Sequence, residues 1–576
     1  KISVEPGVDM KFFIISMACF ALYLFLVVPA VNSPLTTDEL TWPIAAQSLI
    51  QNGKTVVFYG ESVQSSPPLY VNTQVFLYKL LGVSNFSSRL IGIICVFFQL
   101  IVLSCFGKIF FNDKKEEWKF VLLTSLIFIT NPAIIQGSLI PFEDMSLFPL
   151  LLALFALAFI KLAERPGLAS ALILGTIFAA CLWPKFTTPL VLIPCMFVYY
   201  LLNKDSKGMG HAIATLLIGI FLFLSTWWAY ANLRTLDFTA PINYAVSAFL
   251  SKQAYKQTAS VFLGFSTNII RFILWFGLYS FLLGAIALAK RISFFMKKKI
   301  LEPVDFLVIY ILFVGVTYTF VGGMTFGFPK YYFPIFLPLV ILSVFTFKEV
   351  LDEISVKDAA VYIGTAVLTF FYFYFVVGDP IYFFNFSMRE MIVIGEAPVK
   401  NVFYLFGDKV FFYVVPGVIV FLIVKAYARN RKLITRILIT LLIMIFGANL
   451  ALDVIHRRAS YMTRYCYGEE GTEDLIEHLH RNLAAGDAVL ATCDIIYYLR
   501  QKGHDVSYIS DAVWYHTDDI EKIIGDPSVR FVVYSVGHND INQFKSTILN
   551  PAFQAGLKRR FARQEVGTYT VWQRMR

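Results

Sequence analysis

The chain has 576 residues, of which 57% are hydrophobic and 15% are charged, with a formal net charge of +10. This composition excludes an ordinary water-soluble globular protein and predicts a polytopic α-helical membrane protein. The charge does not indicate nucleic acid as a partner, because most of the excess lies in short joints between apolar segments, where membrane topology accounts for it. Membrane lipids with anionic headgroups are the expected partner of these joints.

Apolar segments follow one another along the first 452 residues, and most are near the ~20 residues that span a hydrocarbon core. The region 168–202 is assigned as a hairpin that turns at Trp183-Pro184-Lys185, because a single helix of that length would measure about 52 Å against a core of ~30 Å. We therefore predict about thirteen transmembrane helices, at 12–31, 90–111, 120–140, 146–163, 168–183, 187–202, 212–232, 267–289, 304–324, 331–347, 359–377, 410–428 and 433–452.

Basic residues gather in the joints that follow the even-numbered segments. Because Lys and Arg are retained on the cytoplasmic side, the N-terminus is expected to be cytoplasmic and the region after residue 452 extracytoplasmic. The protein is thus expected in the cytoplasmic (inner) membrane, as a monomer. The joints contain Lys108, Lys114, Lys115 and Lys119; Lys161 and Arg165; Lys204 and Lys207; Lys290, Arg291 and Lys297 to Lys299; Lys348 and Lys357; and Lys425, Arg429, Arg431, Lys432 and Arg436.

The first outer loop, residues 32–89, is much longer than a simple connection needs to be. It places two carboxylates, Asp38 and Glu39, side by side at the end of an apolar segment. A short helix is predicted from Leu40 to Gln51, and a second one after Pro67-Pro68 that ends at Gly82. The second has an apolar stripe and is expected to lie along the membrane surface; the stripe consists of Leu69, Phe76, Leu77, Leu80 and Leu81.

A second acidic pair, Glu143-Asp144, occupies the next outward segment. Carboxylates at this depth are costly, so they normally face a watery cavity or a partner charge. The candidate partners are basic residues on the same predicted side of the membrane: Lys185, Arg234, Arg271 and Lys330.

The composition changes after residue 452. Residues 453–576 read as strand, helix and strand, then a helix near 516–525, another strand, and two strands within 561–574, which predicts a small α/β domain. The glycines of this domain form no G-x-G-x-x-G or Walker pattern, so nucleotide hydrolysis is not expected. We therefore divide the chain into a membrane domain, 1–452, and an extracytoplasmic domain, 453–576.

A set of residues occurs in a defined order along the chain: Asp38-Glu39, Pro67-Pro68-Leu69-Tyr70, Arg89, an acid after the third span, Lys185, and Lys330-Tyr331-Tyr332 with Pro334 and Pro338. This ordered set resembles the GT-C class of membrane glycosyltransferases. Within that class the sequence is most similar to the bacterial lipid A aminoarabinose transferases and the protein O-mannosyltransferases. The resemblance implies an enzyme that transfers a sugar, with inversion, from a polyprenyl-phosphate donor to a lipid, glycolipid, glycan or protein acceptor on the extracytoplasmic face.

This reaction needs cations for the leaving phosphate and a carboxylate for the acceptor hydroxyl. Asp38 is expected to be the general base or an acceptor-orienting group, with Glu39 and Asp144 as its catalytic supports. The expected donor-phosphate contacts are Lys185, Lys330, Arg89 and Arg271, and the expected supporting residues are Glu143, Tyr70 and Tyr331. No cofactor is required and no metal cluster is predicted, although a divalent cation held by Asp38 and Asp144 stays an open alternative.

Several alternatives remain open. Thr36-x-x-Glu39 matches a capping box, so Glu39 could serve only to cap a helix. The aminoarabinose transferases usually carry Lys directly before the Pro-Pro pair, where this chain has Ser66, so another cation must substitute or the acceptor differs. A secondary transporter or flippase of lipid-linked sugars is the main functional alternative. A disulfide between Cys466 and Cys493 is permitted outside the cytoplasm.

Overall fold

The structure is a computed structural model. It divides into two compact units. The helical unit comprises residues 1–29, 92–139 and 143–458, and the mixed unit comprises 30–91, 140–142 and 459–576. The mixed unit thus joins the first outer loop to the C-terminal domain. The structure describes residues 10–575 except for 36, 54–55, 59–60, 63–67, 164, 240–242, 244–268, 270–271, 322–329, 347–358, 381–407, 427–430, 457–470, 492, 505–506, 510–523 and 536–549.

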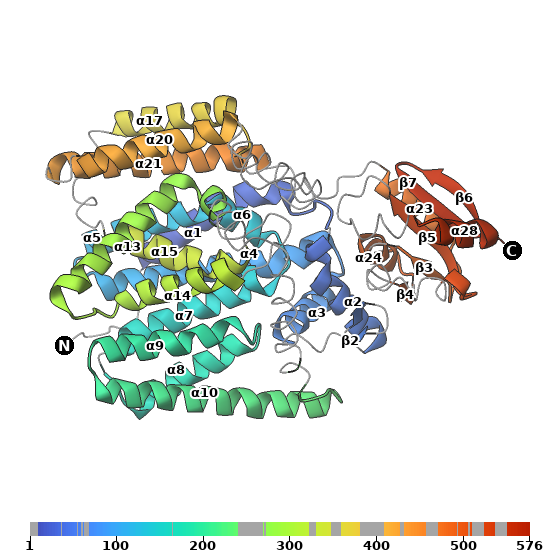
Figure 1. Cartoon of the computed structure of the whole chain (residues 1–576), viewed down its shortest axis with the longest axis horizontal. Helices are drawn as coiled ribbons and strands as arrows, with labels where there is room; N and C mark the ends of the chain where they lie inside the picture. The colour runs from blue at the N-terminus through green and yellow to red at the C-terminus, as the bar shows by residue number, and fades with distance from the viewer. Residues whose placement is uncertain are drawn as a thin grey trace. The chain divides into compact units, whose positions relative to one another are not determined.

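Helices account for almost all the described residues of the helical unit (Figure 1). Helix α4 begins in the mixed unit and continues into the helical unit. The helices are α1 (Met10–Val27), α4 (Asn85–Phe110), α5 (Lys114–Ile129), α6 (Pro132–Ser138), α7 (Leu147–Leu162), α8 (Leu168–Leu182), α9 (Leu192–Leu202), α10 (Ser206–Leu233), α13 (Leu278–Lys298), α14 (Asp305–Val321), α15 (Phe333–Thr346), α17 (Ala359–Phe371), α20 (Asp408–Ala426) and α21 (Arg431–His456). Short turns of other helix types are η1 (Val28–Ala30), η3 (Glu143–Met145), η4 (Thr188–Val191), η5 (Lys330–Tyr332) and η7 (Tyr372–Val377).

Six of the described helices are long and apolar enough to cross a membrane, and the bent pair α5 and α6, which meet at 64°, adds a seventh if it is one span. Five shorter apolar helices accompany them. A multi-pass membrane protein is therefore confirmed, whereas the predicted number of thirteen spans is not. The six are Lys11–Ala30, Asn85–Phe110, Ser206–Leu233, Leu278–Lys298, Ala360–Val377 and Leu433–His456.

The region 168–202 folds as two helices, α8 and α9, as its length predicts. Helix α10 packs against both of them (Figure 1). Small residues permit the close approach of α8 and α10: a Cβ atom added at Gly219 would lie 2.5 Å from Phe178, and one added at Gly175 would lie 2.7 Å from Ile218. Glycine at such positions brings helix backbones together in membrane proteins.

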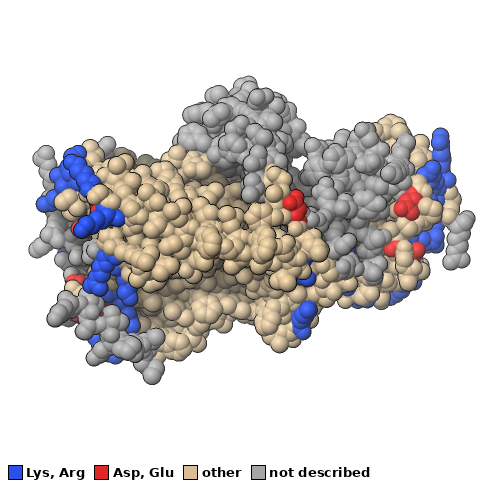
Figure 2. All heavy atoms as spheres, turned by 90° about the horizontal axis from the view of Figure 1, so that it is seen from below, with Lys and Arg blue, Asp and Glu red and all other residues tan. Residues whose placement is uncertain are grey.

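Lys and Arg side chains gather at one end of the helical unit, while its middle shows almost no charged side chains (Figure 2). Exposed basic residues at helix ends include Lys108, Lys114, Lys204 and Lys297. This separation of charged ends from an apolar middle suits a bilayer. The orientation across the membrane stays a prediction.

The mixed unit contains both helices predicted for the first outer loop. Helix α2 (Thr41–Asn52) follows the short turn η2 (Thr37–Leu40) and ends at Gly53, whose φ is 68°, and α3 (Leu69–Leu81) ends at Gly82. In α3, Phe76, Leu80 and Leu81 of the predicted apolar stripe expose 63%, 66% and 48% of their surface, whereas Leu77 is buried. An exposed apolar face of this kind fits the predicted position along a membrane surface.

The C-terminal part of the mixed unit is a five-stranded mixed sheet with flanking helices, which confirms the predicted small α/β fold. Its strand order is β4-β3-β5-β7-β6, with β3 parallel to β4 and β5, and β7 antiparallel to β5 and β6. The helix predicted near 516–525 lies mostly outside the described residues. The elements of the mixed unit are β1 (Val56–Phe58), β2 (Glu61–Ser62), α23 (Thr472–Asn482), β3 (Ala488–Leu490), α24 (Cys493–Gln501), β4 (Ser507–Ile509), β5 (Val529–Ser535), α28 (Pro551–Arg560), β6 (Phe561–Val566) and β7 (Tyr569–Arg574).

Candidate active site

The first cluster of predicted site residues lies in the helical unit, in the turns next to α7 and α8. Asp144 belongs to η3, directly before α7, and Lys185 lies in the turn after α8. The Nζ atom of Lys185 donates to both carboxylate oxygens of Asp144, at 2.6 and 2.5 Å. The side chain of Asp144 is 2% exposed and that of Lys185 is 17% exposed. A buried carboxylate thus holds a partly accessible cation in place.

Turn η5 contributes Lys330 and Tyr331 to the same cluster and lies against η3. The Tyr331 ring centroid is 5.0 Å from Nζ of Lys185 and 5.4 Å from Nζ of Lys330. Both ammonium groups are within the range in which an aromatic ring attracts a cation. Lys185 and Lys330, which are far apart in the sequence, therefore both lie beside the ring of Tyr331.

Tyr318, in α14, completes the cluster and was not predicted. Its ring stacks on that of Tyr331, with centroids 5.3 Å apart and planes 12° apart. Its hydroxyl group forms a hydrogen bond with Thr188 Oγ1 in η4. In the sequence Tyr318 sits inside an apolar segment, where aromatic residues usually serve packing, so no local pattern distinguishes it.

Charge in this cluster is unevenly distributed. Burial raises the pKa of Glu143 to about 8, and the neighbouring Asp144 contributes to the increase, while Lys185 and Lys330 oppose it. Burial alone would lower the pKa of Lys185, but the Asp144 carboxylate reverses that effect and raises it above its ordinary value. The raised pKa keeps Glu143 mainly neutral near pH 7, so its carboxyl group does not offset the charge of the neighbouring lysines. The excess of positive charge suits a phosphate anion.

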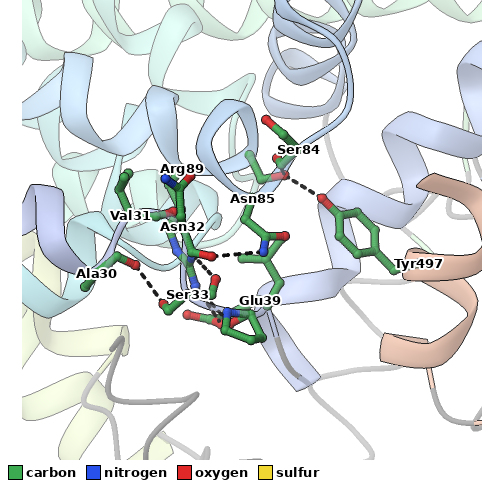
Figure 3. Close-up of polar contacts among 12 residues, drawn as sticks. Ala30, Val31, Asn32, Ser33, Glu39, Ser84, Asn85, Arg89 and Tyr497 are labelled. Atoms are coloured by element: carbon green, nitrogen blue, oxygen red, sulfur yellow. Dashed lines mark hydrogen bonds and ion pairs between the residues drawn. The ribbon is translucent and has the colours of Figure 1, made fainter. Parts of the chain in front are cut away.

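The second cluster lies in the mixed unit, around the guanidinium group of Arg89 (Figure 3). Its NH1 atom donates to the carbonyl oxygen of Val31 at 3.0 Å and to that of Ser33. Its NH2 atom donates to the carbonyl oxygen of Pro34 at 3.2 Å and to Glu39 Oε2 at 3.4 Å. Both Arg89 and Glu39 are 0% exposed. The described contacts of Arg89 hold the chain that leads to Asp38, which favours a positioning role; a contact with the donor phosphate stays a prediction.

Glu39 is not part of a described helix cap. The N-cap position of α2 is Leu40, with no side-chain capping hydrogen bond, and the carboxylate of Glu39 pairs with Arg89 instead. An ion pair shielded from water requires both partners, because either charge alone would be buried without compensation. The capping box depends on Thr36, which lies outside the described residues, so that alternative stays open beside the ion pair.

Some predicted residues lie outside the part of the chain that the structure describes. The backbone of Asp38 belongs to η2, but its side chain is not described, and neither are Arg271 and Ser66. The proposed cysteine pair also falls there, since Cys466 and the side chain of Cys493 are not described. Tyr70 is buried in α3. These catalytic and binding roles stay predictions.

The described residues contain no group of three or more His, Cys, Asp or Glu side chains that could hold a metal ion. The alternative of a cation held by Asp38 and Asp144 requires the Asp38 side chain, which lies outside the described part of the chain. It therefore stays open.

No protein-family model and no curated protein matches the sequence. The fold matches two solved structures of ArnT from Cupriavidus metallidurans. The structure bound to undecaprenyl phosphate has a TM-score of 0.58 at 14% identity, over 98% of both chains. The apo structure has a TM-score of 0.57 at 14% identity, over 98% of this chain and 97% of that one.

Arabinosyltransferase EmbB from Mycobacterium smegmatis matches more weakly, with a TM-score of 0.43 at 12% identity over 81% of this chain and 43% of that one. At these identities the likeness concerns the fold. The chain therefore shares the fold of the ArnT structures over nearly its whole length, as the resemblance to GT-C glycosyltransferases implies.

Proposed function

We propose that this protein is a membrane glycosyltransferase that moves a sugar, with inversion, from a polyprenyl-phosphate donor to a lipid, glycolipid, glycan or protein acceptor on the extracytoplasmic face. The cluster of Lys185, Asp144, Lys330 and Tyr331 is the observation that carries this proposal, because it concentrates positive charge among helices. The shared fold supports it, since one of the matching structures is bound to undecaprenyl phosphate.

In the proposed reaction the acceptor hydroxyl oxygen forms a bond to the anomeric carbon of the sugar. The bond from that carbon to the phosphate oxygen breaks, and its electron pair leaves with the polyprenyl phosphate. Lys185 and Lys330 stabilise the charge that grows on the phosphate. Asp38 accepts the proton of the acceptor hydroxyl. If the acceptor is itself a phosphate, it is already ionised, and Asp38 orients it instead.

Asp144 has a different role in this scheme from the one that the sequence indicates. It holds Lys185 with two short hydrogen bonds and keeps the lysine charged despite burial. Asp144 therefore acts on the donor side, because it positions the lysine that contacts the donor phosphate. Glu39 acts on the acceptor side through Arg89, which binds the backbone of residues 31, 33 and 34.

The test uses the full chain purified in detergent. Undecaprenyl-phosphate pentoses and hexoses are supplied with a phosphorylated glycolipid, a membrane lipid extract or an acceptor peptide, and release of undecaprenyl phosphate is measured. Wild type should release it, and Asp38→Asn should lower the rate about 10²- to 10⁴-fold while donor binding survives. Asp237→Asn, which alters an exposed aspartate after α10, is the matched control and should behave as wild type.

Movement of the donor across a vesicle membrane without release of undecaprenyl phosphate would instead support the flippase alternative. Equal rates for wild type and Asp38→Asn would remove Asp38 from the chemistry. Absence of release with every donor in the panel would contradict the proposed reaction.

A further inference from the structure

Helix α24 carries two adjacent tyrosines that contact the first outer loop, more than 400 residues away in the sequence. The hydroxyl group of Tyr498 accepts a hydrogen bond from the backbone N–H of Leu35 at 2.7 Å. The same hydroxyl lies 3.4 Å from the carbonyl oxygen of Leu35, to which it donates. One side chain thus engages both backbone groups of Leu35, three positions before Asp38.

Tyr497 contacts the loop on the other side of Asp38. It is 0% exposed and packs in one apolar cluster with Leu35, Leu40 and Ile44. Its hydroxyl group is 3.0 Å from Ser88 Oγ at the start of α4. Its backbone carbonyl oxygen accepts a hydrogen bond from Gln47 Nε2 in α2, at 3.4 Å. The two tyrosines therefore flank the carboxylate pair along the chain.

Helix α4 binds the same segment from its own side (Figure 3). Arg89 donates to the carbonyl oxygens of Val31, Ser33 and Pro34, and Asn85 Nδ2 donates to that of Asn32 at 3.2 Å. The backbone of residues 31–35 is therefore hydrogen-bonded by α4 at four carbonyl groups and by α24 at the fifth residue. Backbone outside helices and sheets needs other partners for its polar groups, and here the side chains of α4 and α24 supply them and fix the path of the segment.

A catalytic carboxylate on a long loop must be held within about 0.5 Å of its productive position. Among the described residues of the loop before α4, the regular elements are the turn η2, the helices α2 and α3, and the short pairing of β1 with β2. We infer that Tyr498 and Tyr497 are positioning residues for Asp38, so that the C-terminal α/β domain is an integral part of the acceptor side of the active site. This inference rests on the proposed function and assigns the domain a task within it.

Tyr498→Phe removes one hydroxyl group and keeps the ring. In the undecaprenyl phosphate release assay we expect kcat to fall about tenfold, because small displacements of a catalytic group are costly, while the KM for the donor stays within about twofold of wild type. Tyr497→Phe should give a smaller loss in the same direction. The matched control is Tyr534→Phe, which removes a buried hydroxyl in the same domain that accepts hydrogen bonds from Trp572 at 3.0 Å and Gln554 at 3.1 Å.

Hydrogen exchange gives a readout that does not require activity. The Leu35 N–H loses its acceptor in Tyr498→Phe, so peptides covering residues 31–40 should exchange faster than in wild type. The same peptides should be unchanged in Tyr534→Phe, even if that variant unfolds at a lower temperature. A role confined to general stability would change both variants alike.

Faster exchange at 31–40 together with a lower kcat in Tyr498→Phe alone would support the inference. Equal behaviour of Tyr498→Phe and Tyr534→Phe in both measurements would overturn it. If wild type itself releases no undecaprenyl phosphate, the proposed function fails, whereas the exchange measurement still decides whether α24 holds the loop.

Discussion

The pair of Glu39 and Arg89 in the mixed unit and the pair of Asp144 and Lys185 in the helical unit differ in how fully they are shielded from solvent. Glu39 and Arg89 are both 0% exposed and are joined at 3.4 Å. In the pair of Asp144 and Lys185 the acid is 2% exposed, the cation is 17% exposed, and the two are joined at 2.5 Å. The first pair is closed to solvent, while the second keeps its cation within reach of it.

The numbers of hydrogen-bond donors sharpen this difference. Arg89 directs four N–H···O contacts at protein oxygens, three of them backbone carbonyls. Lys185 has three N–H donors and directs two at Asp144. Exposure and described partners thus separate the two cations: Arg89 is buried against the backbone of the loop, whereas Lys185 is partly exposed and paired with one carboxylate.

The largest effect on stability is expected from Arg89→Met. The change leaves the Glu39 carboxylate buried without its cation. It also removes the hydrogen bonds that Arg89 donates to three backbone carbonyl groups. Together these losses should lower the free energy of unfolding by about 3–5 kcal/mol. Thermal unfolding in detergent measures it, with the exposed Arg234→Met as the control. A variant that unfolds like wild type but binds the donor poorly would instead make Arg89 a phosphate contact, as the sequence pattern suggests.

The second prediction uses the double variant Lys185→Met with Asp144→Asn. Because both charges are removed together, neither is left uncompensated, and the unfolding temperature should stay close to that of wild type. Release of undecaprenyl phosphate should nevertheless fall about 10²- to 10³-fold, through loss of charge stabilisation at the leaving group. An unfolding loss as large as that of Arg89→Met would show that this pair is structural as well, and the contrast between the two units would disappear.

The third prediction concerns Asp144→Asn alone. Without the carboxylate, burial dominates and lowers the pKa of Lys185, so the ammonium group loses its proton as the pH rises. At neutral pH and above, the KM for the donor should increase about tenfold relative to wild type, and lower pH should restore it. A KM that is equally high at every pH would mean that Asp144 contributes through something other than the charge of Lys185.

Local sequence patterns predicted the elements well where turn chemistry is strong. Gly53 and Gly82 were expected to end α2 and α3, and both do. The turn after residue 182 was expected from length alone and is present. Alternating strand patterns also located β6 and β7 within 561–574. The causes of the helix ends lie within a few residues along the chain, whereas the hairpin follows from the length of 168–202 against the thickness of a bilayer.

The site was less predictable, because its contacts join distant parts of the chain. Arg89 at the start of an apolar segment resembles an interfacial anchor, and nothing local shows that it binds Val31 and Glu39. Tyr498 lies 463 residues from Leu35. Tyr318 becomes recognisable only when its ring is seen on Tyr331. Sequence order supplied the acids and bases of the site, while their pairing depends on tertiary packing.

The smallest expected effect concerns Glu143. Its carboxyl group titrates near neutral pH, which distinguishes the Lys185 cluster from the buried pair of Glu39 and Arg89. Its pKa is raised by burial from 4.5 to about 8, so the folded state holds this proton more tightly than the unfolded state. Its contribution to stability is therefore complete below pH 4.5 and is lost as the pH rises through about 8. Over the same rise, ionised Glu143 adds negative charge beside Lys185 and Lys330, which should weaken binding of the proposed donor phosphate.

The KM for the donor should thus increase a few-fold from about pH 7 to about pH 9 in wild type, and Glu143→Gln should abolish that increase without lowering turnover at pH 7. Donor titrations at fixed acceptor concentration measure it. If the KM for the donor still increases between pH 7 and pH 9 in Glu143→Gln, another group must be responsible for the titration. Because the ion pair of Glu39 and Arg89 is closed to solvent, the protection of the amides at residues 31–40, corrected for the intrinsic rise of exchange with pH, should stay constant over the same titration, which tests the contrast between the two units.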